Sequence, residues 1–201
     1  MTSQGKRLGI LGGTFSPIHV GHMIMAENAL GDLNLDEVVF MPAGRPPHKE
    51  SETSISIPHR LAMVEAAIAD RPGFTCGRLD IDHGELSYTW RLLERFGEWH
   101  AGADLWFIVG GDSLQDFAKW ARPDRVLELA RLAVIERPGF AVDEQVLDAL
   151  PGMRDRVDIV RAPLCDVSST DLRERVESGR SIRYLVPEPV RVYIEANHLY
   201  E

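Results

Sequence analysis

The sequence predicts an α/β protein, a doubly wound parallel sheet with helices on both faces in three layers. Stretches with helical spacing occur along the chain, among them MIMAENAL, HRLAMVEAAIA, YTWRLLERFGEW and PDRVLELA. Between them lie short apolar runs without polar alternation, as strands covered on both faces require, at residues 8–11, 38–41, 105–109, 132–135 and, more weakly, 157–160. This alternation of strand and helix is typical of a doubly wound parallel sheet.

Glycines follow the first four predicted strands, at positions 12, 13, 44, 110, 111 and 139. In an open parallel sheet, ligands bind outside the carboxyl ends of the strands, where glycine lets the backbone come close to them. We therefore expect these four loops to face one crevice. The long polar segment 44–58 is interpreted as a loop, and loops of that length often bind or cover a ligand.

Length and composition favour one domain over residues 1–201, because 201 residues with 44% apolar composition can bury one sizeable core. A formal net charge of -9 and the lack of a basic stripe argue against a general nucleic-acid binder. Cys76 and Cys165 form no CxxC pair, and we expect both to be buried as small apolar residues. The apolar runs are too short for a signal peptide or a membrane span, which favours a soluble cytoplasmic protein.

The most informative segment is GGTFSPIHVGH at residues 12–22. Here the first strand ends at the glycines, the turn contains Pro17, and a helix is predicted to begin near Gly21. His22 then lies in the first helical turn, where unpaired backbone N–H groups and the helix dipole favour an anion. His19 lies just ahead of it, so both imidazoles can point at the same anion.

This segment differs from three common ligand-binding motifs. It lacks the GxxxxGK[ST] of a Walker phosphate loop and the GxGxxG of a dinucleotide-binding turn. Its histidines are three residues apart without a glutamate between them, unlike the HExxH of a zinc site. Two structural histidines capping a turn remain an alternative.

The segment resembles the HxGH signature of the nucleotidyltransferase superfamily, and the whole loop resembles that of the bacterial nicotinate-nucleotide adenylyltransferases. The resemblance implies a Rossmann-like fold. It also implies that ATP is bound by the first loop, through Gly12, Gly13, Thr14, Phe15, His19 and His22.

Three further segments resemble this family in the same order, and SIRYLVPEPVRVYI near the carboxyl end also matches its pattern. PAGRPPHK at residues 42–49 resembles its PxxxPPHK loop, whose Lys49 would bring a cation to the phosphates; alone, it could be a linker. IVGGDS at 108–113 resembles its GxDS segment, in which Gly110 allows close approach and Asp112 accepts from a ribose hydroxyl; the alternative is a helix N-cap by Asp112 or Ser113.

The third segment, VSSTDLR at residues 167–173, resembles the superfamily's ISSTxIR. Hydroxyls and backbone N–H groups at a helix start suit phosphate oxygens, and an arginine one turn later can add a charge-assisted pair. The implied ATP ligands are Ser168, Ser169, Thr170 and Arg173; the alternative is a well-capped surface helix.

The acceptor pocket is implied by ELSYTW at residues 85–90, which resembles the family's SYT segment. Thr89 and the neighbouring backbone amides of Ser87 and Tyr88 would then meet the nicotinate carboxylate, and Trp120 would stack on the pyridine ring. Lys49 and Asp112 would also belong to the acceptor site, through a phosphate and a ribose hydroxyl. The alternative for Trp120 is packing in the core.

The reaction implied by the resemblance is transfer of the adenylyl group of ATP to nicotinate mononucleotide, giving deamido-NAD and pyrophosphate. His19, His22, Lys49 and Arg173 are the candidate catalytic residues, and ATP would arrive with Mg²⁺ that keeps much of its water shell, without a protein cage of metal ligands.

Two positions depart from the family pattern, Ser16 where Asp is usual and Leu92 where a second threonine is usual. Three alternatives remain: nicotinamide mononucleotide as acceptor, phosphopantetheine as acceptor, and a non-catalytic nucleotide-binding regulator. The phosphopantetheine enzymes lack the PPHK and SYT segments. The sequence leaves open whether the chain forms a homo-oligomer.

Overall fold

The fold is built on one parallel sheet, seen in a computed structural model that describes residues 5–45, 55–136 and 142–201. Among these residues, six strands pair in the order β3-β2-β1-β4-β5-β6. They are β1 (Arg7–Gly13), β2 (Glu37–Pro42), β3 (Phe74–Cys76), β4 (Asp104–Gly110), β5 (Arg131–Glu136) and β6 (Val157–Arg161). The chain winds outward from β1 to β3, returns to the middle of the sheet as β4, and winds outward the other way to β6. The predicted doubly wound sheet is therefore confirmed, with its reversal of direction between β1 and β4.

Successive side chains of the strands belong to two different cores, because neighbouring residues in a strand point to opposite faces. In β4, Trp106 and Ile108 belong to the first core, whereas Leu105, Phe107 and Val109 belong to the second. Both faces are thus apolar, which explains the runs without polar alternation.

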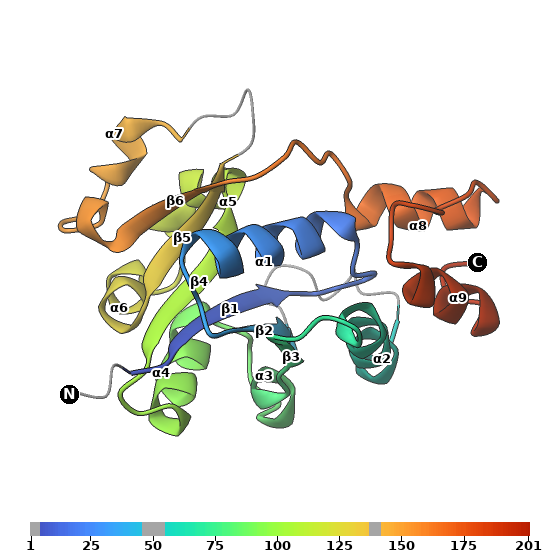
Figure 1. The fold of residues 1–201 in the computed structure, drawn as a ribbon, viewed down its shortest axis with the longest axis horizontal. Helices are drawn as coiled ribbons and strands as arrows, with labels where there is room; N and C mark the ends of the chain where they lie inside the picture. The colour runs from blue at the N-terminus through green and yellow to red at the C-terminus, as the bar shows by residue number, and fades with distance from the viewer. Residues whose placement is uncertain (1–4, 46–54, 137–141) are drawn as a thin grey trace.

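Helices cover both faces and complete the three layers. The first core includes residues of α1 (Val20–Asp32), α2 (Ile57–Ile68), α8 (Ser169–Glu177) and α9 (Glu188–Ala196). The second includes residues of α3 (Leu79–Asp82), α4 (Thr89–Trp99), α5 (Gly111–Gln115), α6 (Pro123–Leu129) and α7 (Glu144–Leu147). Short 3₁₀ turns lie at η1 (Phe117–Lys119) and η2 (Arg154–Arg156). Figure 1 shows α1 and α4 on opposite sides of the sheet.

Two expectations from the sequence need correction. Helix α2 begins at Ile57, so the last two residues of the predicted 44–58 loop are helical. Pro58 stands in the first turn, where its missing N–H is not needed. Cys76 and Cys165 are partly exposed and not buried, because Cys76 ends the short edge strand β3 and Cys165 lies on the connection that leaves β6. None of the described helices is long and apolar enough to cross a membrane.

Candidate active site

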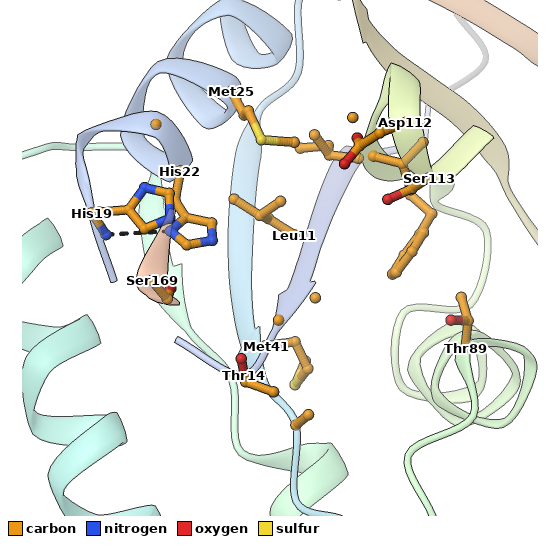
Figure 2. Close-up of a pocket in the computed structure, with 18 of the residues that line it drawn as sticks. Leu11, Thr14, His19, His22, Met25, Met41, Thr89, Asp112, Ser113 and Ser169 are labelled. Atoms are coloured by element: carbon orange, nitrogen blue, oxygen red, sulfur yellow. Dashed lines mark hydrogen bonds between the residues drawn. The ribbon is translucent and has the colours of Figure 1, made fainter. Parts of the chain in front are cut away.

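A cleft of about 640 Å³ opens at the carboxyl ends of β1 and β4, where the winding of the sheet reverses. This is the place where an open parallel sheet binds ligands. Figure 2 shows the histidines of α1 and Ser169 on one side, and Asp112 and Thr89 on the other. Most of the predicted site residues line the cleft: Gly12, Gly13, Thr14, His19, His22, Ser87, Tyr88, Thr89, Gly110, Asp112, Trp120, Ser168, Ser169, Thr170 and Arg173.

Among the described residues, one predicted site residue, Phe15, does not line the cleft. Lys49 lies outside the described residues. Phe15 is only 1% exposed, and its ring packs in the first core beside Phe40. The apolar ring is stabilised by this burial, and the expected contact of Phe15 with ATP stays a prediction, one that its backbone would have to make.

The two histidines lie against each other at the start of α1. His19 is the N-cap residue and His22 lies in the first turn, with ring centroids 3.8 Å apart. The backbone N–H of His19 donates to Nδ1 of His22 at 3.2 Å. Because Nδ1 accepts a hydrogen bond, a neutral His22 carries its proton on Nε2. The sequence predicted this helix start to within one residue.

Gly21 makes room for the ring of His19. A Cβ atom at position 21 would lie 3.0 Å from Cε1 and Nδ1 of that ring, closer than most side chains tolerate. Glycine at this position therefore lets the imidazole lie close to the backbone of the first turn of α1.

The turn between β1 and α1 is held by the carboxyl-terminal part of the chain. Arg173 donates from Nη1 to the carbonyl oxygen of Ser16 at 2.9 Å, and the Ser169 hydroxyl donates to that of Pro17 at 2.9 Å. The carbonyl oxygen of Leu185 accepts from the N–H of Val20 at 3.0 Å. The turn is thus fixed before any ligand binds.

The start of α8 forms another part of the wall. Ser168 is its N-cap residue, and its hydroxyl accepts from the N–H of Asp171 at 3.1 Å, so the capping interpretation of this segment is correct for Ser168. Nη2 of Arg173 donates to Oγ1 of Thr170 at 3.2 Å. These partners orient the Ser168 and Thr170 hydroxyls and the Arg173 guanidinium at the cleft before any ligand binds.

On the opposite wall, α5 follows β4 directly. Gly110 is the N-cap of α5, so the alternative that Asp112 or Ser113 caps this helix is wrong. Asp112 lies in the first turn and is exposed at the cleft, where a hydroxyl group of a ligand could donate to it.

The predicted acceptor residues surround the start of α4. Tyr88 is the N-cap and Thr89 the first residue of this helix. The Ser87 hydroxyl accepts from the N–H of Arg45 at 2.9 Å, so it holds the chain that follows β2 as well as lining the cleft. Trp120 both lines the cleft and packs against Phe117 and Phe107, so packing and a role at the cleft coexist.

Some residues of the wall carry no signal in the sequence. Asp80 lines the cleft and accepts from the N–H of Gly44 at 3.0 Å, but no pattern around it marks it. Apolar residues of the wall include Leu11, Met25, Met41, Phe107, Ile108 and Val167. The apolar residues at strand ends could have been predicted from the expected crevice. Met25 could not, because its place at the cleft depends on how α1 is oriented.

Positive charge is scarce at this cleft. Arg173 is the one arginine or lysine among the described residues of the wall, which also carries Asp80, Asp112 and Asp166. The described part of the chain has no group of three or more His, Cys, Asp or Glu side chains placed to hold a metal ion. The groups of the wall that could attract an anion are therefore Arg173, the histidines and the N-termini of α1 and α8.

Comparison with known proteins agrees with this geometry. A family model described as cytidylyltransferase-like matches residues 10–175. A protein of Thermomicrobium roseum, named as a probable nicotinate-nucleotide adenylyltransferase, is 45% identical over 97% of this chain and 92% of its own length. One of Lactiplantibacillus plantarum with the same name is 40% identical over 98% and 89%.

Solved structures support the fold. Plasmodium falciparum nicotinic acid mononucleotide adenylyltransferase, complexed with NaAD, has a TM-score of 0.81 and covers 97% of each chain at 22% identity. On the strength of the match to the family model and of the near full-length relatives, the chain belongs to the cytidylyltransferase-like family, and within it to the nicotinate-nucleotide adenylyltransferases.

Proposed function

We propose that this chain transfers the adenylyl group of ATP to the phosphate of nicotinate mononucleotide, giving nicotinate adenine dinucleotide and pyrophosphate in NAD biosynthesis. The observation that carries the proposal is one cleft in which the paired histidines of α1 and the N-terminus of α8 lie on one side, and the start of α4 on the other. The names of the relatives at 40–45% identity support the same reaction.

The chemistry needs alignment more than acid–base catalysis. A phosphate oxygen of the mononucleotide attacks the α-phosphorus of ATP, a new P–O bond forms, and the bond to the leaving pyrophosphate breaks. The acceptor phosphate is already ionised at neutral pH, so no general base is required. The protein must bring two repelling anions together and neutralise the charge that grows on the leaving group.

The residues of the first wall suit this task. We assign to the Nε2–H of His22 a hydrogen bond to a phosphate oxygen of ATP, because its Nδ1 is already engaged with the N–H of His19. His19, Ser169, Thr170 and Arg173 would contact the same phosphates, aided by two helix N-termini. Lys49, outside the described residues, is proposed to bring a further cation to both substrates.

The second wall suits the acceptor. The N-terminus of α4 and the Thr89 hydroxyl would meet the nicotinate carboxylate, with Ser87 and Tyr88 beside them and Trp120 against the ring. Backbone N–H donors satisfy a carboxylate, whereas a carboxamide presents them with an unmatched donor. We therefore expect the nicotinate form to be preferred over the nicotinamide form. Asp112 would accept from a ribose hydroxyl.

Magnesium fits this site as a companion of ATP. Mg²⁺ usually keeps several waters and binds through substrate phosphates, so it does not need a group of protein carboxylates. The wall offers hydroxyls and single carboxylates that suit its water shell. When bound with ATP, it would supply positive charge that offsets the negative charge of the phosphates. We further propose that residues 1–201 fold as one domain, which the single sheet formed by strands from residue 7 to residue 161 supports.

The test is pyrophosphate release from ATP and Mg²⁺ with three acceptors offered separately: nicotinate mononucleotide, nicotinamide mononucleotide and phosphopantetheine. We expect rapid release with the nicotinate form and release at least roughly tenfold slower with the others, since one unmatched buried polar group costs that much. Equal rates with both mononucleotides would show that Leu92 has relaxed the choice of acceptor. ATP binding without release from any acceptor would favour the regulator instead.

A further inference from the structure

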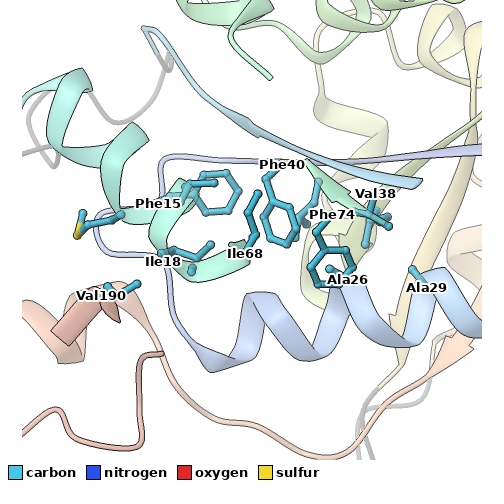
Figure 3. Packing of buried hydrophobic residues seen from close by; sticks show 14 of the residues in the cluster. Phe15, Ile18, Ala26, Ala29, Val38, Phe40, Ile68, Phe74 and Val190 are labelled. Atoms are coloured by element: carbon cyan, nitrogen blue, oxygen red, sulfur yellow. The ribbon is translucent and has the colours of Figure 1, made fainter. Parts of the chain in front are cut away.

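Phe15 occupies an unusual backbone conformation in the turn between β1 and α1. Its φ is +50°, in the left-handed region that bulky residues rarely adopt. Such a residue persists only where its surroundings over-determine it, and these residues cluster at functional sites. Figure 3 shows its ring packed beside Phe40, Ile18 and Ile68, which fixes the side chain. The peptide that precedes it must also be held.

Arg60 on α2 holds that peptide. Its Nη1 donates to the carbonyl oxygen of Thr14 at 2.8 Å, and the residue is only 2% exposed, so it lies behind the cleft wall. In a trans peptide the C=O and the next N–H point in opposite directions. Drawing the Thr14 oxygen towards α2 therefore turns the Phe15 N–H away from Arg60. Thr14 itself lines the cleft, so Arg60 fixes a peptide at the edge of the cleft wall.

The backbone N–H of Phe15 is a second unusual feature of this turn. Among the described residues it has no hydrogen-bond partner, although the surrounding turn is otherwise well anchored. Buried backbone N–H groups are nearly always paired. A phosphate oxygen in the cleft would provide the missing acceptor.

The charge of Arg60 has no hydrogen-bonded carboxylate among the described residues. Buried arginines are normally paired with carboxylates, yet within the described residues the one hydrogen bond of this guanidinium is to a carbonyl, and its Nε has no partner. Burial lowers the pKa of Arg60, and the nearby Tyr200 and Asp80 oppose this effect. A neutral donor could satisfy the Thr14 oxygen with a much smaller desolvation cost.

We propose that Arg60 is a positioning residue for the nucleotide: it holds the Thr14–Phe15 peptide with its N–H towards the cleft, and the phosphates of the bound nucleotide serve as counter-ion to its buried charge. The inference rests on the proposed function, which supplies a nucleotide triphosphate at this cleft. It also explains how a wall with little positive charge of its own can attract a highly charged ligand, because a charge in a low-dielectric interior acts over a longer range.

The test compares Arg60→Met, which removes both charge and donor, with Arg60→Lys, which keeps a charge. Three quantities are measured for each variant: the Kd of a non-hydrolysable ATP analogue by calorimetry, the KM for ATP with kcat, and the Tm. The matched control is Arg71→Met, because Arg71 follows the same helix but forms an exposed ion pair with Glu27. We expect Arg60→Met to raise the Kd and the KM for ATP at least roughly tenfold, the worth of one charged hydrogen bond.

The remaining expectations distinguish a role of Arg60 in nucleotide binding from a role in folding alone. Arg60→Lys should recover most of the affinity, Arg71→Met should bind like wild type, and the Tm of Arg60→Met should stay within a few degrees of wild type. An unchanged Kd and KM in Arg60→Met would overturn the proposal. So would a reduced binding stoichiometry with an unchanged Kd, because that shows only a smaller folded fraction.

Two outcomes need a second measurement. If Arg60→Met does not fold, Arg60→Gln keeps a donor for the Thr14 oxygen without the charge; weakened analogue binding supports the proposal, and wild-type affinity overturns it. If no mononucleotide supports turnover, the proposed function fails. The role of Arg60 is still decided by the Kd values, because the ATP analogue binds without an acceptor.

Discussion

At the scale of single residues, the site divides into those that the sequence marks and those that only the fold reveals. His19 and His22 could be predicted because they lie within one turn of chain, where a strand ends and a helix begins. Asp80 and Arg60 could not be predicted, because Asp80 reaches the cleft from α3 and Arg60 reaches the turn from α2. Contacts between segments far apart in sequence leave no local pattern.

The sharpest prediction at this scale is for His22. We expect His22→Ala to lower kcat roughly 10²- to 10³-fold, because it removes one preorganised donor to the charge developing in the transition state. His100→Ala is the matched control, since His100 lies at the opposite end of α4 from the cleft. Pyrophosphate release measures kcat, and circular dichroism checks the fold.

Turnover close to that of wild type in His22→Ala would remove His22 from the chemistry. Unfolding of this variant, with His100→Ala still folded, would instead make His22 a structural residue of the turn.

At the scale of elements, the sequence predicts what is long and apolar and misses what is short. Strand β3 has three residues, of which only Phe74 is buried, so no apolar run announces it. Helix α3 has four residues and α5 has five, too few for helical periodicity to show. The long helices and the inner strands bury whole faces, so their sequences carry a clear pattern of apolar residues.

Helix α1 allows packing and function to be separated, because it contains two glycines in different surroundings. A Cβ at Gly21 would press on the ring of His19, whereas a Cβ at Gly31 would meet no atom within 4 Å. We expect Gly21→Ala to reduce kcat/KM roughly tenfold or more, because a small displacement of a catalytic group is costly. Its free energy of unfolding should change by less than about 1 kcal/mol.

Gly31→Ala is the control in the same helix. It should raise the free energy of unfolding by about 0.5–1 kcal/mol, the difference in helix propensity, and leave kcat/KM unchanged. Equal activity of the two variants would contradict the role given to Gly21, and urea unfolding supplies the stabilities.

At the scale of the whole molecule, function and stability lie at opposite ends of the sheet. The cleft is at the carboxyl ends of the strands, whereas β4, β5 and β6 are tied together near their amino ends by Asp158. This carboxylate accepts from Nε1 of Trp106 at 2.8 Å and from two nitrogens of Arg131, at 2.6 and 2.8 Å. The sequence predicted the crevice from the glycines at strand ends. It could not predict the order of the strands, and so did not reveal this second cluster.

The arrangement predicts how stability depends on pH. Burial raises the pKa of Asp158, but the hydrogen bonds from Arg131 and Trp106 lower it more, so the net shift is downward. A carboxylate with a lowered pKa stabilises the fold above its unfolded pKa of about 3.9, and this stabilisation is lost as the pH falls through its folded pKa. Asp158→Asn should therefore cost about 2 kcal/mol at pH 7, and the cost should shrink below about pH 4.

Urea unfolding of wild type and variant between pH 7 and pH 3 measures this difference. Asp82→Asn is the control, because Asp82 forms an exposed pair with Arg78 at 3.6 Å and should cost no more than about 0.5 kcal/mol at any pH. A cost for Asp158→Asn that stays constant with pH would mean that its charge does not stabilise the sheet. Because the cluster is remote from the cleft, folded Asp158→Asn should bind ATP with wild-type affinity; weakened binding would show that the two ends of the sheet are coupled.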